Sequence, residues 1–163
     1  MRTAAHPSFT RHLTWLDPET KKTTPVECLE AISERLSLSP NGETEVIEKR
    51  AELTFVGSQG DLHQINLSTL TESQFTYAFD HNREPNWTAS GKIYWAAGPP
   101  GDSDVYLKNA DDTGPEELIV EGADFPKNSP DEQWPVFRKT KAEKACRLLV
   151  LKAVQRQRSI PQQ

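Results

Sequence analysis

The chain has 163 residues, a length that suits a single domain and buries about 70% of the unfolded surface. Apolar residues make up 35% and there are twelve prolines, which indicates a modest core with long polar loops. No run of about 18 apolar residues exists, which excludes a membrane-spanning helix. The first residues lack the apolar stretch of a signal peptide, so we expect a soluble, cytoplasmic protein.

Charge is distributed unevenly along the sequence. The net charge is -5, yet the segment from Phe137 to the end carries eight basic residues and one acid. Acidic residues concentrate between 99 and 135, a stretch that is predicted to be rich in loops. The two cysteines, Cys28 and Cys146, are far apart in sequence and are expected to be buried free thiols, which suits a reducing compartment.

The predicted domain organisation is an N-terminal arm over 1–23, one domain over 24–158 and a short tail over 159–163. The domain is expected to begin with a helix over 25–36. Thr24 and Glu27 form a capping box around Pro25, and apolar residues follow at steps of three and four up to Leu36.

From Glu45 to Lys108 the apolar period changes to two, which predicts strands. Five alternating runs are recognised, followed by a sixth, edge strand. These runs are Ala51 to Phe55, His63 to Leu67, Phe75 to Phe79, Ile93 to Ala97, Val105 to Leu107 and Leu118 to Val120. Residues 80–90 are expected to form a longer loop, and no internal repeat with a period of about 20 to 50 residues is recognised.

A second capping box at Thr140 to Glu143 predicts a long C-terminal helix over 141–157. The expected fold class is therefore α+β: an antiparallel, curved meander sheet of five to six strands, flanked by the two helices. One side of the last helix is basic and includes two leucines. A partner protein is expected to contact this side through Lys141, Lys144, Arg147, Leu148, Leu151, Lys152 and Arg156.

An alternative site lies in the loops and on the strands before and after 80–90. A pocket at the mouth of a curved sheet would be lined by Tyr77, His81, Arg83, Trp87, Trp95 and Trp134. Core or loop packing is the more ordinary role for the tryptophans.

The sequence contains none of the motifs that bind nucleotides, metals or acyl substrates. There is no phosphate-binding glycine loop, no nucleophile elbow and no histidine or cysteine spacing typical of zinc. No catalytic residue, metal or cofactor is therefore predicted. The favoured function is a non-enzymatic adaptor or inhibitor that binds another protein. The alternatives are a small-molecule-binding β-cup, which would allow an enzyme, and nucleic-acid binding through the basic helix.

Overall fold

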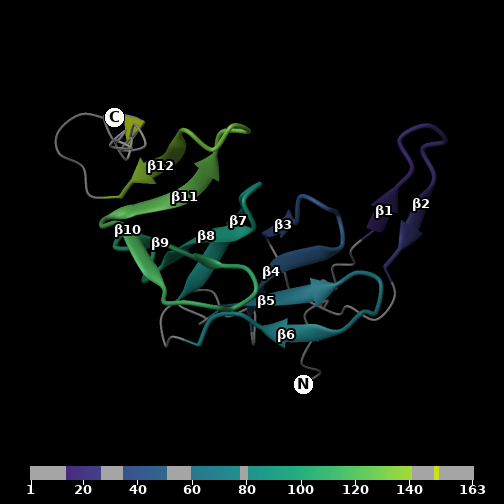
Figure 1. The fold of residues 1–163 in the computed structure, drawn as a ribbon, viewed down its shortest axis with the longest axis horizontal. Helices are drawn as coiled ribbons and strands as arrows, with labels where there is room; N and C mark the ends of the chain where they lie inside the picture. The colour runs from purple at the N-terminus through teal and green to yellow at the C-terminus, as the bar shows by residue number, and fades with distance from the viewer. Residues whose placement is uncertain (1–13, 27–34, 51–59, 78–80, 141–148, 151–163) are drawn as a thin grey trace, which may run out of the picture.

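The computed structural model describes residues 14–26, 35–50, 60–77, 81–140 and 149–150, and these form thirteen β-strands. No helix occurs in these described ranges, so none there is long and apolar enough to cross a membrane. The predicted α+β class is therefore wrong for the part of the chain that the structure describes. The fold there is built from β-sheets alone (Figure 1).

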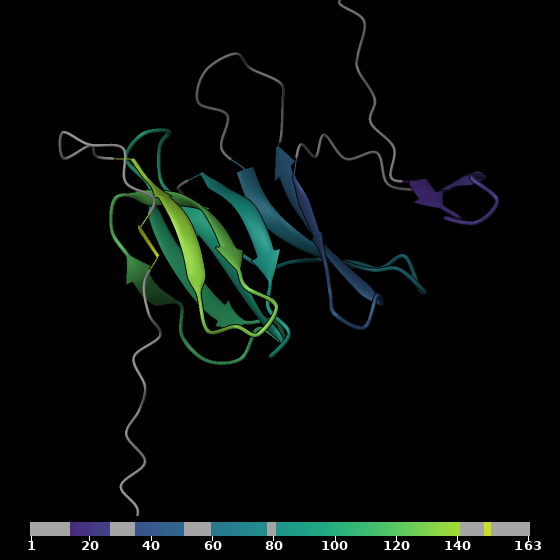
Figure 2. The ribbon, with the colours of Figure 1, turned by 90° about the horizontal axis from the view of Figure 1, so that it is seen from above.

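The strands form one hairpin and three antiparallel sheets. The hairpin joins β1 (Thr14–Leu16) to β2 (Thr23–Pro25) and stands apart from the sheets (Figures 1 and 2). The first sheet contains β3 (Leu36–Leu38), β4 (Thr44–Arg50), β5 (Gly60–Asn66) and β6 (Glu72–Gln74). The second contains β7 (Asn82–Trp87), β8 (Lys92–Ala97), β9 (Asp104–Asn109) and β10 (Glu117–Val120). The third contains β11 (Ala123–Asn128), β12 (Pro135–Lys139) and β13 (Leu149–Val150).

Each sheet is an up-and-down meander, and the sheets follow one another in a regular way. The last strand of one sheet leads directly to the first strand of the next, from β6 to β7 and from β10 to β11. The first strand then lies against the first three strands of the preceding sheet: β7 against β3, β4 and β5, and β11 against β7, β8 and β9. This is the arrangement of consecutive blades in a β-propeller.

Apolar side chains fill the two spaces between successive sheets. Between the first and second sheets, Val46, Leu62 and Phe75 pack against Ile93 and Trp95. Between the second and third sheets, Val105 packs against Ala123 and Phe137. A further cluster joins Ile47 and Ile65 on the other side of the first sheet. Since Val46 and Ile47 are adjacent and both fully buried, β4 is covered on both faces and does not show the half-buried alternation.

The same hydroxyl-containing turn connects the first two strands of every sheet. In the first sheet, the Ser39 Oγ accepts a hydrogen bond from the Thr44 amide at 2.9 Å. In the second, the Thr88 Oγ1 accepts one from the Lys92 amide at 2.9 Å, and in the third the Ser129 Oγ accepts one from the Trp134 amide at 3.0 Å. The turn recurs at intervals of about 40 to 50 residues, so the expectation that the chain has no repeat is wrong.

The first expected helix is contradicted at both ends by strand pairing. Thr24 pairs with Trp15 in the hairpin, and Leu36 pairs with Ile47 in the first sheet. The capping box is a local signal, and pairing with distant strands overrides it. Residues 27–34, which would form the middle of this helix, lie outside the described residues.

The expected C-terminal helix is contradicted where the structure describes it. Leu149 and Val150 form β13, which pairs with Phe137 and Val136 of β12. A short apolar run such as Leu149-Val150 is compatible with either a strand or a helix, so the sequence pattern alone does not distinguish the two. The remainder of the predicted helix, at 141–148 and 151–157, lies outside the described residues.

Four of the predicted strands are confirmed, as β5, β8, β9 and β10. The first predicted run, Ala51 to Phe55, lies outside the described residues. The run from Phe75 to Phe79 is not a strand where it is described, because β6 ends at Gln74. The loop expected over 80–90 contains β7, which the sequence hides because its residues are polar and include Pro85.

Candidate functional site

The first strands of the three sheets, β3, β7 and β11, are here called the inner strands, and three equivalent residues in or directly before them meet one another. Arg35, Glu84 and Phe125 each lie four residues before the hydroxyl residue of their turn. The Arg35 Nη1 is 3.0 Å from the Glu84 Oε1, and the Phe125 amide donates to the Glu84 Oε2 at 2.6 Å. The Arg35 guanidinium also lies over the Phe125 ring, 5.1 Å from its centroid. Glu84 and Phe125 both have positive φ, at 59° and 53°, so the backbone turns sharply at this point in both strands.

Further charged residues extend this group, which we call the inner-strand cluster. Arg138 donates to both oxygens of Asp124, at 2.8 and 2.7 Å, and its guanidinium is 4.2 Å from the centroid of the Phe125 ring. Arg83 is buried and donates to the Gly98 carbonyl and the Ser103 Oγ, each at 3.0 Å. The Arg35 Nη1 also lies 3.6 Å from the Glu48 Oε2. The cluster consists of Arg35, Glu48, Arg83, Glu84, Asp124, Phe125 and Arg138.

The charges of the inner-strand cluster balance, with three guanidiniums against three carboxylates. Burial raises the pKa of Glu84, and the Phe125 amide and Arg35 oppose that rise. Within the described residues, no group of three or more histidine, cysteine, aspartate or glutamate side chains is placed to hold a metal ion. The inner-strand cluster therefore links the first sheet to the second through the Arg35–Glu84 ion pair, and the third sheet to both through the Phe125 amide and ring.

The side of the first sheet that points away from the second is apolar: Val26 and Leu67 pack against its two buried isoleucines, and two leucines of β3 are exposed beside them. Leu36 pairs with Ile47, and Leu38 pairs with Glu45, so all four side chains lie on one side of the sheet. Ile65 lies on the same side, beside Glu45. We call this side the leading face and define it by Leu36, Leu38, Glu45, Ile47, His63, Ile65 and Glu72.

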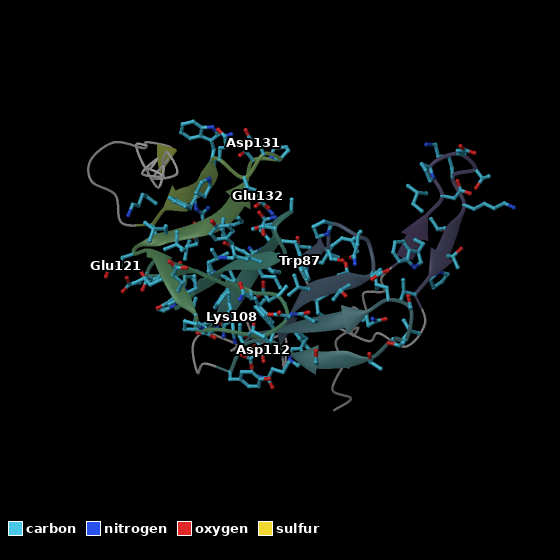
Figure 3. All side chains as sticks on the ribbon, in the orientation of Figure 1. Trp87, Lys108, Asp112, Glu121, Asp131 and Glu132 are labelled. Carbon is cyan, nitrogen blue, oxygen red and sulfur yellow. The ribbon has the colours of Figure 1, made fainter. Side chains whose placement is uncertain are left out.

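The two leucines of the leading face are exposed where their equivalents are covered. Leu36 is 50% exposed and Leu38 is 43% exposed. The residues equivalent to Leu36 in the next two sheets are Pro85 and Pro126, and both are buried because a preceding sheet covers them. Trp87, the equivalent of Leu38, is partly buried and lies where β7 meets the first sheet (Figure 3). At Leu36 and Leu38 the leading face is therefore more exposed than the equivalent positions of the next two sheets.

Four titratable residues lie on or beside the apolar part of this face. Burial raises the pKa of Glu45, which is 7% exposed. The His63 Nδ1 lies 2.7 Å from the Glu72 Oε1, and Lys49 lies 2.6 Å from the same oxygen. Burial lowers the pKa of His63 despite the neighbouring Glu72. Glu72 is thus paired locally, whereas Glu45 is a carboxylate in an environment that disfavours its charge.

The predicted pocket residues are not brought together as one site. Trp95 is buried between the rings of Phe75 and Tyr106, at 5.8 Å from each, and its Nε1 donates to Asn82. Trp87 packs against the same core, Arg83 belongs to the inner-strand cluster, and Tyr77 is 64% exposed. His81 and Trp134 are half-buried, Trp134 at the end of the turn between β11 and β12. Trp87 and Trp95 therefore belong to the hydrophobic core between the first and second sheets.

The predicted partner-binding residues all lie outside the described residues. They are Lys141, Lys144, Arg147, Leu148, Leu151, Lys152 and Arg156. The leading face was missed because Leu36 was assigned to the core face of a helix. The signal that would have revealed it is the recurrence of Ser39-Pro40-Asn41-Gly42 as Thr88-Ala89-Ser90-Gly91 and Ser129-Pro130-Asp131-Glu132.

Comparisons with known proteins support the arrangement of the strands and identify no family. No family model matches the sequence, and no curated protein matches it. Among solved structures, an oligogalacturonate lyase in complex with manganese superimposes with a TM-score of 0.63 at 15% identity, covering 83% of this chain and 43% of that chain. Dipeptidyl peptidase 4 of Porphyromonas gingivalis gives a TM-score of 0.51 at 9% identity, covering 74% of this chain and 26% of that one.

A third solved structure, that of a putative TolB from Agrobacterium tumefaciens, gives a TM-score of 0.47 at 16% identity. The match covers 73% of this chain and 59% of that one. The chain therefore spans less than two thirds of each of these three chains. At such identities the first two likenesses concern the arrangement of the strands alone, and their activities do not transfer with it.

Proposed function

We propose that this protein is a non-enzymatic protein-binding module and that its partner docks on the leading face. One observation carries the proposal: Leu36 is 50% exposed where the equivalent Pro85 and Pro126 are buried, and Leu38 is 43% exposed where the equivalent Trp87 and Asn128 are partly buried. An apolar patch rimmed by polar residues is typical of an interaction surface.

The surroundings of the two leucines support the same proposal. Ile47 and Ile65 are fully buried beside them, so the exposed leucines continue an apolar layer that already exists. Large apolar side chains in the centre of an interface contribute most of its binding energy, and polar residues at the rim contribute little. His63, Lys49 and Glu72 would form such a rim. A reducing, cytoplasmic location remains part of the proposal, supported by the low cysteine content of the sequence.

The test compares proteins recovered from the native host with three baits. The first bait is the wild-type chain, the second carries Leu36→Gln and Leu38→Gln, and the third carries Leu118→Gln. Leu118 is 46% exposed on β10, so it is a matched control in another sheet. We expect a partner that the first and third baits recover equally and that the second recovers at least about tenfold less.

Circular dichroism and thermal unfolding must show that all three baits are folded. Affinity is then measured with the purified partner by calorimetry. Equal recovery by the wild type and the double variant would exclude the leading face as the docking surface. A partner lost equally in the Leu118→Gln bait would show that general surface hydrophobicity explains the binding.

A further inference from the structure

The sequence contains one asparagine that is followed directly by glycine, Asn41-Gly42, in the turn between β3 and β4. Such a pair is chemically reactive, because the backbone nitrogen after an asparagine can attack the side-chain carbonyl carbon, and glycine has no Cβ to hinder the approach. Asn41 is exposed, and a Cβ added to Gly42 would meet no atom within 4 Å other than those of its chain neighbours. The reactive pair therefore lies where water reaches it.

The reaction of this pair has two steps, and water is its only co-reactant. In the first step a bond forms between the Gly42 nitrogen and the Asn41 Cγ, and the bond from Cγ to Nδ2 breaks. The side-chain nitrogen leaves as ammonia, with the proton that the Gly42 amide gives up, and a five-membered succinimide ring remains. In the second step water opens the ring at one of its two carbonyl carbons, which gives aspartate or isoaspartate. One amide is thus replaced by one carboxylate, without an oxidant or a reductant.

In the folded turn, each group that must rearrange is held by a hydrogen bond. The Asn41 Oδ1 accepts from the Ser39 Oγ at 2.7 Å and from the Glu43 amide at 3.1 Å. The Asn41 Nδ2, which would leave, donates to the Glu43 Oε2 at 2.9 Å. The Gly42 amide, whose proton must be lost, donates to the Ser39 carbonyl at 2.9 Å. Attack therefore requires the turn to open, because other groups hold both the nucleophile and the carboxamide.

Ser39 ties the orientation of the carboxamide to the strand pairing of the first sheet. It is 6% exposed, so water competes little for its hydroxyl. Its Oγ accepts from the Thr44 amide at 2.9 Å, and its own amide donates to the Thr44 carbonyl at 2.7 Å. The contact that holds the Asn41 Oδ1 is therefore lost only when this end of the β3–β4 pair opens.

The third turn indicates which product the fold accepts. Asp131 is equivalent to Asn41, and its Oδ1 accepts from the Ser129 Oγ and the Gln133 amide. These are the two bonds that Asn41 accepts in the first turn, so an aspartate in its place keeps both and loses only the donor to Glu43. Isoaspartate adds a methylene to the main chain, within a turn whose register the strand pairing fixes.

We propose that Asn41 is a modification site, at which spontaneous deamidation is suppressed by the closed turn and proceeds when the turn opens. Local opening of this kind costs less than global unfolding, so the extent of modification records the opening of the β3–β4 turn. Aspartate is the product that the reclosed turn accepts. The site needs water alone and no second protein, so the inference goes beyond the proposed docking function and stands independently of it.

The test follows Asn41 in the full chain by peptide mapping, with the mass increase from exchange of an amide nitrogen for oxygen as the readout. The protein is incubated in one mildly alkaline buffer, with and without enough urea to unfold it. We expect Asn41 to deamidate at least about tenfold more slowly in the folded chain than in the unfolded chain. Equal rates in the two states would overturn the proposal.

Two matched variants test whether the contacts of Asn41 suppress the reaction. Ser39→Ala removes the hydroxyl that donates to its Oδ1, and Ser129→Ala removes the equivalent hydroxyl in the third turn. The folded rate of each variant is divided by its own unfolded rate. We expect this ratio to rise about fivefold for Ser39→Ala and to stay at the wild-type value for Ser129→Ala. An equal rise in both would overturn the proposal, because general loss of stability would then explain the rate.

Two further variants keep each part of the proposal open to refutation. Glu43→Ala frees the Asn41 Nδ2 by a change at an exposed residue and replaces Ser39→Ala if that variant does not fold. Its ratio is also expected to rise, and an unchanged ratio would refute suppression by the turn. Asn41→Asp installs the product and should unfold at the wild-type urea midpoint. A clearly lower midpoint would overturn aspartate as the product that the turn accepts.

Discussion

The ion pair between Arg35 and Glu84 gives a quantitative test of how the inner strands are held. Glu84 is 5% exposed, and its Oε1 is 3.0 Å from the Arg35 Nη1. At an effective dielectric constant of about 20, two unit charges at this distance attract by about 5 kcal/mol. Desolvation of the buried carboxylate costs several kcal/mol, so the net contribution of the pair is small although each partner depends on the other.

We expect Arg35→Ala to lower the free energy of unfolding by about 2 to 3 kcal/mol. Removing one partner of a buried pair usually costs about 3 to 5 kcal/mol. The expected loss is smaller than this here because Arg35 is 34% exposed, so water reaches the side of the Glu84 carboxylate that Arg35 leaves. Glu84→Gln should cost about 1 kcal/mol or less, because the amide oxygen still accepts from the Phe125 amide.

The double variant decides whether the two effects are coupled. In the Glu84→Gln background, Arg35→Ala should cost about 1 to 2 kcal/mol less than in the wild type, since of the two buried carboxylates beside Arg35 only Glu48 keeps its charge. This difference is the coupling energy. The assay is equilibrium unfolding in urea at pH 7, with the slope checked for constancy. If Arg35→Ala costs the same in both backgrounds, charge pairing does not hold the inner strands and the reasoning is refuted.

Three further predictions concern the turn, the core and the leading face. Thr88→Val removes the hydroxyl that accepts from Lys92 and should cost about 1 kcal/mol in urea unfolding. Trp95→Ala should cost about 3 to 5 kcal/mol, whereas Trp95→Phe loses chiefly the bond to Asn82 and about 1 to 2 kcal/mol. Burial raises the pKa of Glu45, so its contribution to stability is most favourable below its unfolded pKa and is lost as pH rises. Glu45→Gln should therefore raise stability at pH 7 and have little effect below about pH 4, as measured by urea midpoints.

The strands that the sequence predicts correctly are those whose two faces have different surroundings. Ile93 and Trp95 are buried between sheets, while Tyr94 lies on the opposite side of β8 and is partly buried. Apolar residues recur there at every second position, which is the ordinary signal of a strand. The same holds for Val105 and Leu107 in β9.

The inner strands give no such signal because charges and backbone geometry hold them in place. In β7 the buried residues include Asn82, Arg83 and Glu84, and each is satisfied by ion pairs or hydrogen bonds with distant parts of the chain. The partners of a buried polar side chain are not readable from neighbouring residues, so such a strand looks like a loop. Pro85 adds to the effect, although an inner edge strand tolerates it.

The candidate site was hidden for a related reason. Leu36 and Leu38 become informative only when they are compared with Pro85 and Trp87, which requires the register of the repeat. The four residues before each turn differ in sequence between the three sheets. They can therefore be aligned only by using the turn itself as the reference point. Local periodicity instead assigned Leu36 to a helix, because Ile32 and Leu36 are separated by four residues.

The third turn explains why even the repeat escapes notice. Gly42 and Gly91 occupy the fourth position of the first two turns with φ of 74° and 79°, and Glu132 occupies it in the third with φ of 56°. A non-glycine residue in this region costs about 1 kcal/mol or more. Glu132 offsets that cost through its side chain, because its Oε1 accepts from the Ser90 amide at 2.7 Å and so joins the turn of the third sheet to the turn of the second. The glycine that would have marked the repeat in the sequence is thus replaced by a residue whose contact exists only once the sheets are stacked.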